Sequence, residues 1–101
     1  MAKVFIPSLM QKLTNGQDIV DISGATVREI IENLEQKYNG IKVILVDKYK
    51  MKTNISVAVD GEVSPIGLLE KVSENSEVHF IPAVGGGSKI MEDISYEKPW
   101  I

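Results

Sequence analysis

The sequence predicts an α+β fold in which one main helix packs across a mixed sheet of about four to five strands. Two observations support this prediction. Short segments in which apolar and polar residues alternate, separated by turn signals, are typical of strands, and one segment between them carries apolar residues at helical spacing. The chain has 101 residues, so we expect a single domain.

The first two strands are expected to form a hairpin with a long loop. Residues 3–6 are rich in β-forming side chains, and Pro7 closes this segment. Asn15-Gly16 is a strong turn signal. Residues 17–22 then resume as a strand, with Val20 and Ile22 on the same face.

The segment after this hairpin predicts the main helix. Thr26 and Glu29 stand at the spacing of a capping box, in which Thr26 is the N-cap and Glu29 reaches back. The apolar residues that follow recur every three or four positions and so form one stripe: Val27, Ile30, Ile31, Leu34 and Tyr38. Asn39-Gly40 is expected to end the helix with a left-handed C-cap.

The middle of the chain predicts a second hairpin. Residues 41–46 fit either a strand or a short helical turn, and residues 48–52 are expected to be a polar loop. Residues 55–59 alternate as a strand, and Asp60-Gly61 predicts a tight turn into a short return strand at residues 62–63.

The last strand is expected at residues 77–81, with Val78 and Phe80 on one face, and Pro82 should stop its ladder. Before it, residues 65–69 predict a connector with an apolar plug made by Ile66, Leu68 and Leu69. The first and last strands most naturally pair in parallel at the centre of the sheet. This arrangement is the β-grasp, or ubiquitin-like, roll.

Composition excludes several classes of function. The net charge of −3 and the pI of about 5.1 argue against nucleic acid as a partner. The absence of cysteine excludes disulfides, thiolate zinc sites and a thiol nucleophile. His79 is the only histidine, and no catalytic set, metal-ligand cluster or phosphate loop can be assembled, so neither an enzyme nor a metal site is expected. With no long apolar stretch, we expect no membrane contact and a cytoplasmic location.

Three glycines follow the last strand, at Gly85, Gly86 and Gly87. Glycine runs pack no side chains and lose much backbone entropy on ordering, so they are not expected in a core. They would make a thin arm that can enter a narrow slot and approach a nucleotide or a catalytic centre closely. A flexible linker to the remaining residues is the other interpretation.

The segment 80–87, Phe-Ile-Pro-Ala-Val-Gly-Gly-Gly, resembles the carboxyl-terminal signature of the MoaD/ThiS family of sulfur carriers. In that family a final strand runs into a proline, a few small residues and a terminal Gly-Gly. The opening strand at residues 4–7, the helix at 26–34, its end at 38–40 and the hairpin at 57–62 are also similar to the family. The resemblance covers about residues 3–87 and favours the carriers that work with a metallopeptidase in amino-acid sulfur assembly.

The resemblance implies a carrier that binds no cofactor itself. In the family, an adenylyltransferase of the ubiquitin-activating type uses ATP to adenylate the terminal glycine carboxylate. Sulfur then displaces the adenylate, and a sulfur-accepting synthase uses the resulting thiocarboxylate. Carried over to this chain, Gly86 and Gly87 are the diglycine and Gly87 bears the acyl group. Molybdopterin, thiamin, cysteine or methionine synthesis and tRNA thiolation remain open as the receiving pathway.

The chain departs from the family pattern because residues 88–101 follow Gly87. Some family members are trimmed precursors, so we expect a processing peptidase, for which a metallopeptidase is one candidate, to cut after Gly87. The expected organisation is a domain at 1–84, a glycine tail at 85–87 and a removable extension at 88–101. The extension could fold back over the face of the sheet that partners would use for docking, be disordered, or pack against a neighbouring molecule.

A docking patch is expected on the side of the sheet away from the helix. Strand alternation places Phe5, His79 and Ile81 there, close to Pro82 and the glycine tail. Ordinary surface scatter, or cover by the extension, would explain the same pattern. Two other functions also stay open: an interaction module that keeps its tail, and a ubiquitin-like modifier joined to lysines through Gly87.

Overall fold

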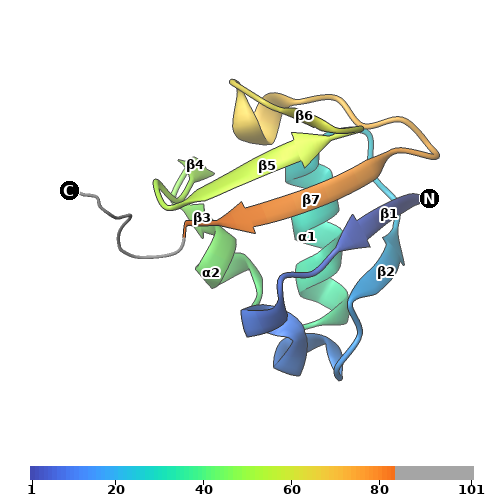
Figure 1. Ribbon diagram of the computed structural model, residues 1–101, viewed down its shortest axis with the longest axis vertical. Coiled ribbons are helices and arrows are strands. Elements are labelled where there is room, and N and C mark those ends of the chain that lie inside the picture. The colour runs from blue at the N-terminus through green and yellow to red at the C-terminus, as the bar shows by residue number, and fades with distance from the viewer. Residues whose placement is uncertain (84–101) are drawn as a thin grey trace.

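The computed structural model describes residues 1–83, and it has the predicted α+β, β-grasp architecture. A five-stranded sheet has the order β2-β1-β7-β5-β6, and the main helix α1 lies across one face (Figure 1). The elements are β1 (Ala2–Phe5), β2 (Ile19–Ile22), α1 (Val27–Lys37), β5 (Ile55–Val59), β6 (Glu62–Val63) and β7 (Glu77–Pro82). The expected glycine tail at 85–87 and the extension at 88–101 lie outside the described residues.

The first and last strands are neighbours at the centre of the sheet, as predicted. β1 and β7 run parallel, with Val4 opposite Val78. β1 also pairs antiparallel with β2, which confirms the amino-terminal hairpin. The long hairpin loop contains a 3-10 helix, η1 (Ser8–Thr14), which the sequence did not indicate. It ends at Asn15 and Gly16, whose φ angles of 57° and 81° suit a residue pair that tolerates the left-handed region.

The capping box at the start of α1 is present. Thr26 Oγ1 accepts a hydrogen bond from the backbone N–H of Glu29 at 3.2 Å, and Glu29 Oε1 accepts one from the N–H of Ala25 at 2.9 Å. The predicted left-handed cap at Asn39-Gly40 is wrong, because the helix ends at Lys37 with Tyr38 in an extended conformation. The positive φ comes later, at Gly40 (101°), where the chain turns toward the next element.

Residues 42–51 form a small unit of their own. The short helix α2 (Lys42–Leu45) decides the ambiguity of residues 41–46 mainly in favour of helix. The expected polar loop is wrong, because β3 (Val46–Asp47) and β4 (Lys50–Met51) pair antiparallel. Lys48 adopts a φ of 60° in the turn between them. The turn allows half-buried Met51 to pack against the core, and sequence alternation alone does not reveal this contact.

Pro82 does not stop the ladder, since it pairs with Ile55 as the last residue of β7. In an antiparallel ladder alternate residues exchange hydrogen bonds, and here Ala83 N donates to Asn54 O at 2.7 Å. The nitrogen of Pro82 therefore points away from β5, toward the side where β1 has already ended at Phe5. A residue without an N–H is tolerated at that position because no partner requires one.

The core lies between α1 and the inner face of the sheet. The helix contributes the predicted stripe, and the strands contribute alternate residues that include Val4, Val78 and Phe80. The predicted apolar plug is only partly correct, because Leu68 is buried whereas Ile66 and Leu69 are exposed. Within residues 1–83 no helix combines the length and the apolar character needed to cross a bilayer.

Candidate docking face and carboxyl-terminal exit

The chain leaves the domain from the central strand of the sheet. β7 is held between β1 and β5, and its pairing with β5 extends to Pro82. The hydrogen bond from Ala83 N to Asn54 O extends the contact with the chain at the start of β5 by one residue, to Ala83. Gly85 follows Ala83 two positions later in the sequence, so the glycine run begins close to the end of β7 along the chain. Gly85, Gly86 and Gly87 themselves lie outside the described residues.

Phe5 and His79 meet on the side of the sheet away from α1. They are register partners on β1 and β7, and their rings stack with centroids 4.0 Å apart and planes inclined by 8°. The His79 Nε2 atom also lies 3.8 Å from Glu77 Oε1 on the same strand. The pair therefore presents a flat aromatic surface at the centre of the sheet, with a carboxylate beside it.

This pair belongs to a row of side chains that crosses all five strands. Successive register partners place one residue from each strand in this cross-sheet row: Ile19, Phe5, His79, Ala58 and Val63. Ile19 and Val63 at its two ends are exposed. The sequence interpretation did not include them, although strand alternation carries the signal. Whether Ile19 and Val63 lie in line with Phe5 and His79 depends on the strand register, which is set only in the folded sheet.

Ile81 extends this apolar surface toward the exit of the chain. It lies two residues beyond His79 on β7, opposite Ser56, and its side chain is 44% exposed. Pro82, the fourth residue expected in the patch, pairs with Ile55 and so lies on the opposite face of the strand. The structure thus brings Phe5, His79 and Ile81 to one face and does not bring Pro82 to it.

Glu35 is the carboxylate with the clearest electrostatic perturbation, and its role is structural. The backbone N–H of Lys42 donates to its Oε1 at 2.8 Å, and Gly40 N–H donates to both oxygens. These hydrogen bonds hold the pKa of Glu35 below its ordinary value. The contacts fasten the turn between α1 and α2. Among residues 1–83, no cluster of three His, Cys, Asp or Glu side chains could hold a metal ion.

Comparison with known proteins places the chain in a family. The family model described as the ThiS family matches residues 4–87, and the match ends on Gly87. This chain belongs to the ThiS family. It is 33% identical over 89 residues to the sulfur carrier protein CysO of Mycobacterium tuberculosis, covering 83% of this chain and 96% of that protein.

Solved structures give the same result. A chain from the crystal structure of the Amycolatopsis orientalis BexX/CysO complex superposes with a TM-score of 0.81 at 37% identity, covering 86% of this ThiS-family chain and 100% of the other. The crystal structure of Mycobacterium tuberculosis CysO superposes with a TM-score of 0.77 at 31% identity, covering 83% and 100%. ThiS and CysO proteins are small carriers, so this family member is not an enzyme.

Proposed function

We propose that this protein carries sulfur as a thiocarboxylate on Gly87, after residues 88–101 have been removed. The observation that carries the proposal is the family match, which runs from the first strand to the glycine at position 87 and no further. The geometry supports it, because the central strand β7 delivers the chain to this point from a fixed position. CysO relatives favour delivery to cysteine synthesis over molybdopterin or thiamin synthesis.

The chemistry requires a free carboxylate at Gly87. While Ser88 is attached, the Gly87 carbonyl is an amide, so a peptidase must first hydrolyse the Gly87–Ser88 bond. The activating adenylyltransferase then joins the carboxylate to AMP from ATP and releases pyrophosphate. Hydrosulfide then attacks the acyl carbon and forms the new C–S bond, while the C–O bond to AMP breaks and AMP leaves with its electron pair. The chain has no cysteine, so it cannot hold the sulfur as a persulfide instead.

The docking face gives the activating enzyme a surface to recognise. The cross-sheet row and Ile81 form an apolar patch on the sheet, and Ile81 is the member that lies nearest in sequence to Gly87. An enzyme seated there would find the glycines within reach, and the absence of Cβ atoms lets the chain pass through a narrow channel. A sulfur-accepting synthase could use the same face after the transfer.

Intact mass spectrometry of the protein from its native host tests the proposal. We expect a chain ending at Gly87, part of it heavier by the mass difference between sulfur and oxygen. Gly87→Val should abolish the heavier form, whereas Gly85→Ala, outside the diglycine, should keep it. Full-length chain alone would instead support an interaction module that keeps its tail. Lysine peptides joined to Gly87 would support a protein modifier.

A further inference from the structure

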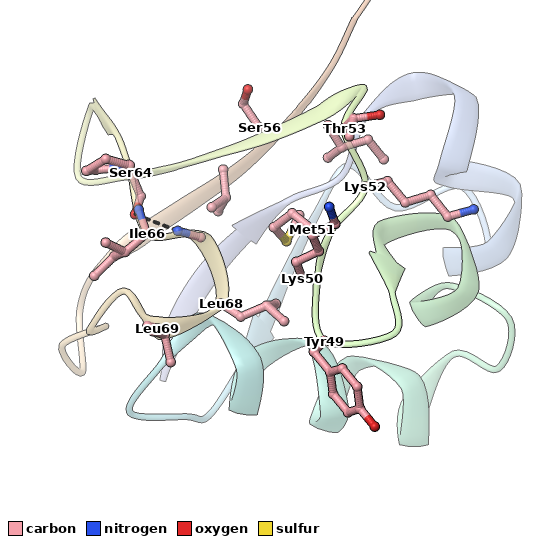
Figure 2. Close-up of a pocket in the computed structure, with 14 residues that line it drawn as sticks. Tyr49, Lys50, Met51, Lys52, Thr53, Ser56, Ser64, Ile66, Leu68 and Leu69 are labelled. Carbon is pink, nitrogen blue, oxygen red and sulfur yellow. Dashed lines mark hydrogen bonds between the residues drawn. The ribbon is translucent and has the colours of Figure 1, made fainter.

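A groove of about 480 Å³ lies beside the outer edge of β5 (Figure 2). β6 pairs with Ala58 and Val59, and a hydrogen bond from Ser64 N to Val57 O continues this contact by one step. Within residues 1–83 no strand pairs with the outer edge of β5 at Ile55, whose N–H donates to Lys52 O. The opposite wall is residues 64–69, which include the 3-10 helix η2 (Gly67–Leu69). Met51 and Leu68 point into the space between these walls. The groove is therefore an opening at the edge of the two-layer fold, separate from the cross-sheet row.

Several apolar side chains around this groove are largely exposed to solvent. Ile66 is 53% exposed and Leu69 is 71% exposed, and Tyr49 also lines the groove with 91% of its surface exposed. Single exposed apolar residues are common, whereas three around one concavity offer a continuous apolar surface to a ligand. Among residues 1–83, the charged side chains that line the groove are Lys50 and Lys52, so the groove favours an apolar ligand with excess negative charge.

The carboxyl-terminal exit lies next to this groove. Ala83 is bonded to Asn54, and the next residue, Ile55, lines the groove together with Thr53. Neighbouring strands lie about 4.8 Å apart. Residues 84–87 can span about 13 Å when extended, which is enough to pass the end of β5 and reach its outer edge. Residues 84–87 are therefore long enough to bring Ser88 to the entrance of the groove.

We propose that residues 88–101 of the same chain dock in this groove. The segment has the composition that the groove favours, because its acidic residues Glu92, Asp93 and Glu97 outnumber Lys89 and Lys98. It also carries apolar side chains that the groove could bury: Ile90, Met91, Ile94, Tyr96, Trp100 and Ile101. Tethering next to the groove gives this segment a high effective concentration, which favours it over a second copy of the chain.

Docking at the β5 edge differs from the expected fold-back over the sheet face. The cross-sheet row stays open, so a partner could recognise the uncut chain. The glycines at 85–87, in contrast, would be held along the path from β7 to the groove, so they would not be free to enter the channel of an activating enzyme. This regulatory consequence rests on the proposed carrier function, whereas the docking itself does not. Removal of residues 88–101 would then free both the glycine arm and the groove.

Hydrogen exchange of the full-length chain, measured on peptides covering residues 88–101, tests the docking. We expect these amides to exchange about tenfold more slowly than in the same chain carrying Leu69→Asp or Ile66→Asp. Leu9→Asp is the matched control, because Leu9 is 61% exposed and lies on η1, outside the groove. It should leave the protection unchanged. Circular dichroism verifies that each variant remains folded.

Three results would overturn the inference. The segment could exchange at the rate of a free peptide in the unmodified chain. It could be protected to the same degree in both groove variants, which would place it elsewhere. The protection could also disappear on dilution, which would make a second copy the binding partner. None of these results bears on whether Gly87 carries sulfur, because the mass measurement decides that separately.

Discussion

The rings of Phe5 and His79 are stacked with centroids 4.0 Å apart on neighbouring parallel strands. This contact lies at the centre of the sheet, on its candidate docking face. Their strands are far apart in sequence and meet only in the folded domain. Ile19 on β2 lies next to the stack at one end of the cross-sheet row, and Ala58 on β5 separates the stack from Val63 at the other end. A partner that binds this face therefore contacts the strand from which the glycine arm leaves.

Replacing Ile81 by aspartate should weaken binding of the activating enzyme. Ile81 is exposed on the candidate docking face, so the free domain should tolerate an aspartate there. In the complex the same charge would be buried, which costs binding free energy. We expect a loss of affinity of at least about tenfold by calorimetric titration, equivalent to about 1.4 kcal/mol. Phe5→Asp should act in the same direction. Leu9→Asp, on η1, serves as the control, and unchanged affinity in both face variants would discard the patch.

Thr26→Ala should destabilise the domain by about 1 kcal/mol, because the N–H of Glu29 loses its acceptor at the start of α1. Urea denaturation monitored by circular dichroism measures the loss. Thr53→Ala is the matched control, since Thr53 is exposed and caps no helix. An equal effect from the two substitutions would mean that the cap contributes nothing beyond side-chain size.

Leu34→Ala should cost about 2–5 kcal/mol, because the side chain is completely buried between α1 and the sheet. The cavity left behind removes contacts that the surrounding core cannot fully replace. Leu9→Ala, at a leucine that is 61% exposed and lies outside the groove, should change the free energy of unfolding by less than about 0.5 kcal/mol. Similar values for the two variants would contradict the position of the core.

The contacts of Glu35 predict a loss of stability in acid. Hydrogen bonds from Lys42 and Gly40 lower its pKa in the folded state below the ordinary 4.5. The folded state therefore favours the ionised form, and the stabilisation is present above the unfolded pKa. It is lost as the pH falls through the folded pKa, because the carboxylate is then protonated in both states.

Denaturation midpoints measured from neutral pH down to about pH 3 test this assignment. Glu35→Gln should be less stable than the native chain at neutral pH and should show a shallower decline in acid. Glu62→Gln, on the exposed strand β6, removes the same charge and is the control. A decline that is equally steep with and without the Glu35 carboxylate would refute the role assigned to it.

The sequence by itself determined the elements whose pattern is local. The stripe from Val27 to Leu34 fixes α1, because helical spacing gathers apolar side chains on one side whatever surrounds them. The turn at Asp60-Gly61 likewise fixes the second hairpin, with φ angles of 53° and 87°. Alternation along β7 was enough to separate buried Phe80 from exposed Ile81.

Only the tertiary structure decided the features that depend on distant neighbours. Residues 42–51 form α2, β3 and β4, with Leu45 fully buried and Met51 packed against the core, and local propensity does not reveal these contacts with distant residues. Pro82 stayed in the sheet because β1 ends before reaching it. The cross-sheet row and the groove at β5 arise from strand register and from the shortness of β6, which are set when separate segments meet.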